Sequence, residues 1–162
     1  MTRLGLGGLA ALLATAAALF TGSVDGRALV RCHTADLSGR LGLVQGAAGS
    51  RIGPLVLKNR SRHTCTLFGF VGGQLYDAAG RPIRTRIVRD HSVPKHTVVV
   101  APGRSARADL HWLAIPPGSA PSCPHPRTFA VTPPDERTQL RVRWTAGWVC
   151  GHGRIDVRPV RR

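Results

Sequence analysis

The sequence predicts an all-β protein, and three observations support that prediction. Short runs of β-forming residues alternate with Gly, Pro and Asn turn signals along most of the chain. No segment after residue 23 repeats apolar residues every 3.6 positions over three turns, so no amphipathic helix is expected. Four cysteines follow an apolar N-terminus, which is typical of a small exported domain cross-linked by disulfides.

The expected strands follow one another between turns. "DAAGRP" is one such turn, in which Gly80 can take a positive φ. Gly72-Gly73 interrupts the third run, and a Pro-Gly pair ends the fifth. In chain order the runs are "GRLGLVQG", "GPLVLKN", "CTLFGFVGGQLYD", "IRTRIVR", "HTVVVAPG", "SARADLHWLA", "RTFAVTPP", "TQLRVRW" and "GRIDVRPV".

Alternation of side chains identifies the buried face of the later runs. Successive residues of a strand point to opposite faces, so every second residue shares one face. The expected inward residues are Ala106, Ala108, Leu110, Trp112, Leu140, Val142, Trp144, Ile155 and Val157. About eight or nine short strands of this kind predict an antiparallel, immunoglobulin-like β-sandwich, with a small barrel as the alternative.

The N-terminus predicts export. "LGLGGLAALLATAAALF" follows Arg3, and the small residues of "TGS" follow the apolar stretch, as in a cleaved signal peptide. We therefore expect a signal at 1–23, an arm at 24–31, one domain at 32–160, secretion, and no membrane span after cleavage. The alternative that the apolar stretch is retained as an N-terminal membrane anchor stays open. Arg31 precedes the first cysteine, which argues against lipid attachment at Cys32.

The cysteines allow two interpretations. Cys123-Pro-His125 and Cys150-Gly-His152 repeat one spacing and could supply four zinc ligands. Thiols in an oxidising compartment rarely stay reduced, so we expect two disulfides and no metal site. Pairing in chain order gives Cys32–Cys65 and Cys123–Cys150, one of three connectivities that four cysteines allow. Weak metal handling by His125 and His152 remains an alternative function.

The order of these motifs resembles the DUF4232 family, a secreted or lipoprotein domain of unknown function in high-GC Gram-positive bacteria. The residues that carry the resemblance are "RCHTADL", "LVLKNRSRHTCTLFGFVGGQLYDAAGRPI", "VVVAPGRSARADLHW", "SCPHP", "FAVTPPDERTQLRVRW" and "WVCGHGRIDVRPV". The resemblance implies an exported, disulfide-linked, immunoglobulin-like domain and no known reaction. Two features depart from the family: Gly69-Phe70-Val71-Gly72 replaces its Gly-Tyr-Pro-Gly turn, and the chain lacks its lipid-attachment motif.

The charge of +15 comes almost entirely from arginines, since Lys58 and Lys95 are the only lysines. This composition is typical of GC-rich genomes, and the arginines are scattered along the sequence. Nucleic-acid binders usually combine basic tracks with stacking aromatics, which total only 5% here, so we expect no nucleic-acid partner. The partner is unknown from the sequence; an anionic cell-wall polymer and an extracellular protein are the candidates.

Catalytic motifs are sparse. Asp90, His91 and Ser92 adjoin in "RDHSV", but neighbours on an extended chain point apart, whereas a triad must converge. Asp135 and Glu136 follow two prolines, where we expect them to be solvated. We therefore expect no enzyme activity and no cofactor. A secreted hydrolase, or an inhibitor of one, is the alternative.

Binding is the leading hypothesis, because sandwich domains present loops at their ends. The candidate loops are "NRSRHT", "RDHSVPKH" and "PPGSAPSCPHP". The second contains Arg89, His91, Lys95 and His96, a basic and pH-sensitive set. Trp112 and Trp144 lie on predicted inward faces and are expected in the core, and Trp148 is expected to pack on the nearby disulfide.

Overall fold

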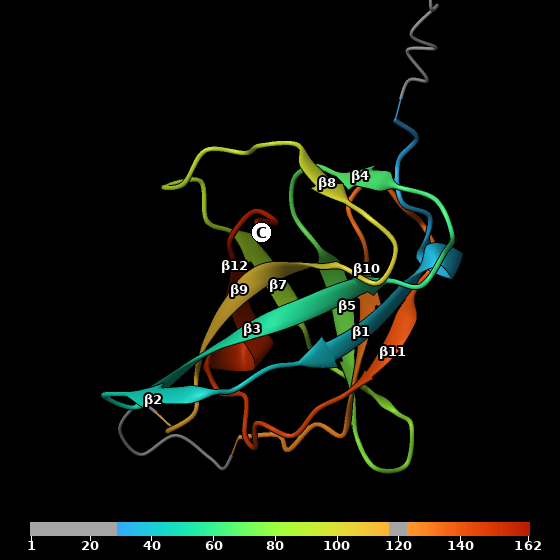
Figure 1. Ribbon diagram of the computed structural model, residues 1–162. Coiled ribbons are helices and arrows are strands. Elements are labelled where there is room, and N and C mark those ends of the chain that lie inside the picture. Colours follow the sequence, from blue (N-terminus) through green and yellow to red (C-terminus); the bar gives the residue numbers. More distant parts are fainter. Residues whose placement is uncertain (1–28, 117–122) are drawn as a thin grey trace, which may run out of the picture.

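The computed structural model describes residues 29–116 and 123–162 (Figure 1). The predicted signal at 1–23 and most of the predicted arm lie outside the described residues, as does the middle of "PPGSAPSCPHP". Within the described ranges, the helical segments are the 3₁₀ turns η1 (Thr34–Asp36) and η2 (Gly151–Gly153). No helix in these ranges has the length and apolar character needed to cross a membrane.

The larger sheet has six strands in the order β1-β3-β9-β12-β7, with β2 paired to β3. Its longest ladder runs from Ser50↔Leu113 to Lys58↔Ser105 between β3 and β9. Figure 1 shows β1, β3 and β9 side by side in this layer. The strands are β1 (Leu37–Leu41), β2 (Gln45–Ala47), β3 (Ser50–Asn59), β7 (Arg86–Arg89), β9 (Ser105–Leu113) and β12 (Arg154–Val157).

The smaller sheet has four strands in the order β11-β10-β5-β6, and a separate two-stranded ladder joins β4 to β8. Residues 30–32, which precede η1, extend this ladder, since Cys32 N–H donates to the Thr66 carbonyl at 2.8 Å and Thr66 N–H donates to the Val30 carbonyl at 2.9 Å. The strands are β4 (Cys65–Leu67), β5 (Gly72–Tyr76), β6 (Pro82–Ile83), β8 (Val98–Val100), β10 (Thr128–Thr132) and β11 (Leu140–Arg143).

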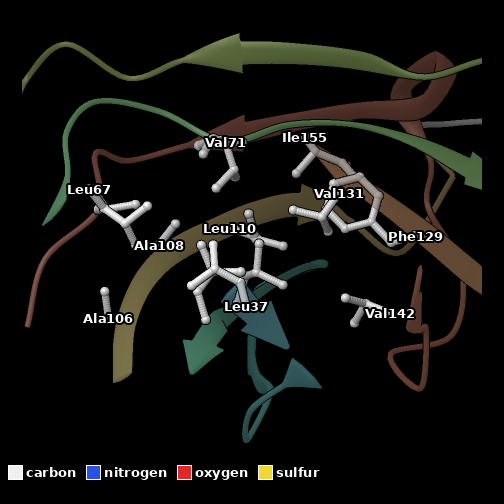
Figure 2. Packing of buried hydrophobic residues seen from close by; sticks show 14 of the residues in the cluster. Leu37, Leu67, Val71, Ala106, Ala108, Leu110, Phe129, Val131, Val142 and Ile155 are labelled. Atoms are coloured by element: carbon white, nitrogen blue, oxygen red, sulfur yellow. The ribbon is translucent and has the colours of Figure 1, made fainter. Parts of the chain in front are cut away.

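The hydrophobic core lies between the sheets, as expected for a β-sandwich. Figure 2 shows side chains of both sheets facing one interior, among them Leu110, Ile155, Phe129, Val131 and Val142. The inward residues predicted from alternation are buried, except that Leu140 is partly exposed. The all-β prediction is confirmed. The described residues form twelve strands rather than eight or nine, because several ladders of two or three residues cannot be recognised from sequence alone.

The expected strand "IRTRIVR" is divided between the two sheets, which corrects that prediction. β6 pairs with β5 in the smaller sheet, and β7 pairs with β12 in the larger one. Thr85 lies at the crossing, where its hydroxyl accepts Leu75 N–H at 3.0 Å and donates to the Ile83 carbonyl at 2.7 Å. The β7–β12 ladder is parallel, whereas every other strand pair of the described residues is antiparallel.

Both disulfides are formed, between Cys32 and Cys65 and between Cys123 and Cys150. Their Cα atoms lie 4.9 and 4.8 Å apart, within the usual range for a disulfide. The connectivity is the pairing in chain order. All four cysteines are buried, and Cys32 and Cys65 belong to the hydrophobic core cluster.

The chain turns sharply through η2 before β12. Gly151, His152 and Gly153 all adopt positive φ angles, of 59°, 58° and 76°. Glycine tolerates this region without strain, whereas a residue with a Cβ does not. Gly151 and Gly153 therefore let the chain bend into its last strand, and His152 is a residue with a side chain that is held in the left-handed region between them.

Candidate functional site

Two adjoining hollows lie beside the predicted binding loop, between β7, β9 and the end of β12. The first has a volume of about 620 Å³ and the second about 510 Å³, and Asp109 and Arg158 line both. The polar residues lining them are Arg89, Asp90, His91, His96, Thr97, Asp109, His111, Arg154, Asp156, Arg158, Arg161 and Arg162. The aliphatic side chains of Ile52 and Val88 also line the first hollow.

Two of the predicted loop residues pack on one aromatic ring. The His91 ring meets Phe70 edge-to-face with centroids 5.0 Å apart, and the Arg89 guanidinium lies 5.8 Å from the same ring. A guanidinium over a ring face gains cation–π energy of about 0.5–1 kcal/mol at an exposed site. Phe70 precedes β5, so these contacts fix the start of the loop to the end of the smaller sheet.

The other two predicted residues take different positions. The Lys95 ammonium lies 5.2 Å from the centre of the half-exposed Phe68 ring. His96 lines the second hollow. The structure therefore does not gather the four predicted residues into one cluster; it divides them between aromatic contacts and the walls of the hollows. Sequence reasoning missed Phe68 and Phe70 because their partners lie more than fifteen positions away.

Asp90 is held by hydrogen bonds rather than by a histidine. One carboxylate oxygen accepts Ser92 N–H at 2.9 Å, and the other accepts Arg158 Nε–H at 3.0 Å. The hydrogen bonds from Ser92, followed by that from Arg158, lower the pKa of Asp90 to about 2. His91 turns toward Phe70. The adjacent Asp90, His91 and Ser92 thus form a local turn and an ion pair, not a converged triad.

The remaining carboxylates of the hollows are also paired with arginines. Asp156 accepts Arg154 Nε–H at 2.9 Å and lies 3.5 Å from His111 Nδ1. Asp109 accepts two N–H groups of Arg161, at 2.9 and 2.7 Å. Every aspartate that lines the hollows therefore has an arginine partner, and the further arginines leave these walls with an excess of positive charge.

The histidines of the Cys-x-His motifs do not share a site with sulfur ligands, because both disulfides occupy the sulfurs. His125 packs edge-to-face on Trp148 with centroids 5.8 Å apart, and His152 is exposed on η2. Within residues 29–116 and 123–162, no group of three His, Cys, Asp or Glu residues has the geometry to hold a metal ion.

The tryptophans are distributed largely as predicted. Trp112 and Trp144 are buried, with ring centroids 4.9 Å apart. Trp148 is 48% exposed, and its ring packs against the ring of His125. Its carbonyl accepts Trp112 Nε1–H at 3.1 Å, so the backbone of Trp148, more than its ring, connects it to the core.

The "NRSRHT" loop is organised around a fully buried asparagine. The Asn59 amide donates to the carbonyls of His63 at 2.8 Å and Val100 at 2.9 Å. Its oxygen accepts both the N–H and the hydroxyl of Ser61, at 2.8 and 2.7 Å. This is a side-chain-stabilised turn of the type that Asn favours, and it assigns Asn59 a structural role in this candidate loop.

Glu136 is not solvated, which corrects the prediction for the turn after the two prolines. Its carboxylate accepts Thr34 N–H at 3.0 Å and the Thr34 hydroxyl at 2.9 Å, and it lies 3.1 Å from His33 Nδ1. The side chain is only 9% exposed. These hydrogen bonds, led by that from the Thr34 backbone, lower the pKa of Glu136. The sequence gives no signal of the contact, because its partners lie about a hundred positions earlier.

Of the comparisons with known proteins, only the one with family models gives a match. Neither curated proteins nor solved structures provide a match to this chain. A family model does match, over residues 32–161, and its description is a domain of unknown function, DUF4232. The matched range coincides with the described sandwich from the first disulfide cysteine to the end of the pairing between Arg161 and Arg107. This chain therefore belongs to the DUF4232 family.

Proposed function

We propose that this protein is an exported, non-catalytic binding domain that acts on a partner in the cell envelope or outside the cell. The observation that carries the proposal is the pairing of Asp90, Asp109 and Asp156 with arginines beside two open hollows. Such walls can recognise a ligand through charge and hydrogen bonds. Each of these carboxylates already accepts a hydrogen bond from an arginine.

Acid–base chemistry argues against the hydrolase alternative. An efficient general base has a pKa near the working pH. The pKa of Asp90 is about 2, and both of its oxygens already accept hydrogen bonds. It therefore can neither accept a proton at neutral pH nor orient His91, which packs on Phe70 instead.

Export is supported by the predicted signal and by the two disulfides. Disulfides persist in oxidising compartments and are rare in the cytosol. Loops of 33 and 27 residues are closed by the two bridges, which constrains a domain of modest core size. An extracellular partner therefore fits the proposal better than a cytosolic one.

The proposal is tested with the full chain expressed with its own N-terminus in a Gram-positive host. Cell fractionation should recover it outside the membrane, and the purified protein should sediment with insoluble envelope material at low salt. Recovery in the cytosol with four reduced thiols would contradict export.

The same preparation tests catalysis. A panel of ester, peptide and glycoside substrates should show no turnover that depends on Asp90 or His91. Hydrolysis that is lost in both Asp90→Asn and His91→Ala, while the fold is retained, would contradict the non-catalytic part of the proposal and favour the hydrolase alternative.

A further inference from the structure

The outer face of the larger sheet is far more basic than the order of residues suggests. The β1–β3 and β3–β9 registers place Arg40, Val56 and Arg107 in one row across three strands. Because side chains alternate along a strand, Lys58 shares this outward face. The basic face is defined here by its seven cations, Arg40, Lys58, Arg86, Arg107, Arg154, Arg158 and Arg161, all of which are exposed.

The few carboxylates on this face already form ion pairs with arginines. Asp109 and Asp156 are the acidic residues on the outward positions of these strands, and Arg161 and Arg154 bind them. Arg158 pairs with Asp90 from the neighbouring loop. Four cations remain without an ion pair in the described part of the chain, namely Arg40, Lys58, Arg86 and Arg107.

We propose that the basic face binds a linear anionic glycan, an inference that rests on the proposed binding function and names its surface and ligand. The charge is complementary to an anionic ligand: four unpaired cations face solvent on one surface and are available to pair with oxyanions. Guanidinium groups pair in a bidentate fashion with carboxylates and similar oxyanions, which favours arginine at such sites.

The spacing of the cations fits a repeating polymer. Neighbouring strands lie about 4.8 Å apart, so the Cα atoms of Arg40 and Arg107 are separated by roughly 10 Å across β3. Lys58 lies two residues from Val56 along β3, roughly 7 Å away. A single small anion cannot reach cations so widely spaced, whereas a chain with one charge per sugar can contact several at once.

The uncharged side chains between the cations favour a glycan over a nucleic acid. Ile52, Pro54 and Val56 form an aliphatic strip on the outward side of β3. No Phe, Tyr or Trp occupies an outward position of β1, β3, β7, β9 or β12, so the described face lacks a stacking platform for bases. A further hollow of about 360 Å³ lies beside Arg40 and Lys58, where Val56 and Ser105 also line it.

The test measures binding of polygalacturonate, a linear glycan with one carboxylate per sugar, to the purified full chain by calorimetry at several salt concentrations. The variant pair Arg40→Gln and Arg107→Gln removes two free cations from the face. The matched control, Arg141→Gln with Arg143→Gln, removes the same charge from exposed residues of β11 in the other sheet.

The face variant should weaken binding about tenfold. It should also reduce the slope of log affinity against log salt by roughly 1–1.5, because the polymer releases fewer counterions when two cations of the protein are missing. The control should change neither by more than about twofold. A second face variant, Lys58→Gln with Arg86→Gln, should repeat the loss. If Arg40→Gln with Arg107→Gln alters the thermal unfolding temperature, the binding of this second variant is used to judge the inference instead.

Several outcomes would overturn the inference. Equal weakening by face and control variants would mean that net charge, not this face, binds the polymer. Tighter binding of poly-dT or of vesicles containing anionic lipid, at equal charge concentration, would identify a different ligand class. Sedimentation with envelope material but no binding of polygalacturonate would overturn the inference while leaving the proposed function in place. Loss of both would remove the proposed function as well.

Discussion

Replacement of Gly153 by alanine should destabilise the protein far more than an ordinary glycine substitution. Gly153 is buried, has φ of 76°, and lies against the backbone where the chain crosses between the sheets. A Cβ at this position would lie 1.8 Å from the Arg84 carbonyl oxygen and 2.7 Å from its carbon. The obstacle is backbone, so it cannot move aside as a flexible side chain would.

The expected cost has two parts. The left-handed backbone costs an L-residue about 1–2 kcal/mol. Displacing the Arg84 carbonyl is overpacking, which costs about 1–3 kcal/mol and involves both strands that flank the crossing. The sum of about 2–5 kcal/mol is a large part of the 5–15 kcal/mol by which a typical domain is stable.

Gly103→Ala is the matched control. Gly103 has φ of 74°, yet a Cβ there meets no heavy atom within 4 Å, so only the backbone cost of about 1–2 kcal/mol applies. Urea unfolding with disulfides intact, followed by fluorescence of the buried Trp112 and Trp144, measures both free energies. Gly153→Ala should lose at least about 1 kcal/mol more than Gly103→Ala. Equal losses would refute the close contact between Gly153 and Arg84.

Three further predictions concern stability. Replacing Cys32 and Cys65 together by alanine should lower the free energy of unfolding by about 3–4 kcal/mol, measured by thermal unfolding, because the bridge closes a loop of 33 residues; an unchanged midpoint would contradict this. Asn59→Ala should cost about 2–4 kcal/mol in urea, since it removes the buried donor to the Val100 carbonyl and the side-chain hydrogen bonds that hold the turn at Ser61 and His63; a loss below 1 kcal/mol would not fit. Asp90 has a pKa lowered from 3.8 to about 2, so its stabilising contribution is complete above about pH 4 and disappears as the pH falls through 2. Asp90→Asn should therefore be less stable than the native chain at pH 7 and equally stable near pH 2 in a pH series of urea unfolding; a constant difference would contradict the assignment.

The buried face of the sandwich could be predicted because it depends on local alternation. In β9, Ala106, Ala108, Leu110 and Trp112 are all buried, as their spacing predicts. The presence of two disulfides followed from the number of cysteines and the expected compartment, whereas the sequence left three connectivities open and the structure selects the pairing in chain order. These features need only residue type and spacing, which a single sequence contains.

Contacts between distant segments could not be predicted. The crossing at Thr85 depends on which sheet offers a free edge, so "IRTRIVR" has the same alternation whether it remains whole or divides. From the sequence, Glu136 is predicted to be a solvated turn residue, because the sequence does not show that Thr34 of η1 packs against it. In the same way, Phe70 gains its partners Arg89 and His91 only when the loop folds back.

The basic face shows how a sheet can concentrate charge that is dispersed in the sequence. Arg40, Lys58, Arg107 and Arg154 are separated by 18 to 49 positions, and all but Lys58, which Asn59 follows, have glycine or apolar residues on both sides. The alternation was visible, but the face emerges only from the strand order β1-β3-β9-β12-β7, which places their outward sides together. Strand order was the missing information, not residue identity.

The most direct test of the binding surface is an amide chemical-shift map during titration of the ¹⁵N-labelled protein with polygalacturonate. If the basic face binds the glycan, the shifts should concentrate at residues 38–40 of β1, 52–58 of β3, 105–111 of β9 and 154–158 around β12. The amides of β10 and β11 should remain unchanged. Shifts spread evenly over both sheets, or confined to β10 and β11, would contradict the account.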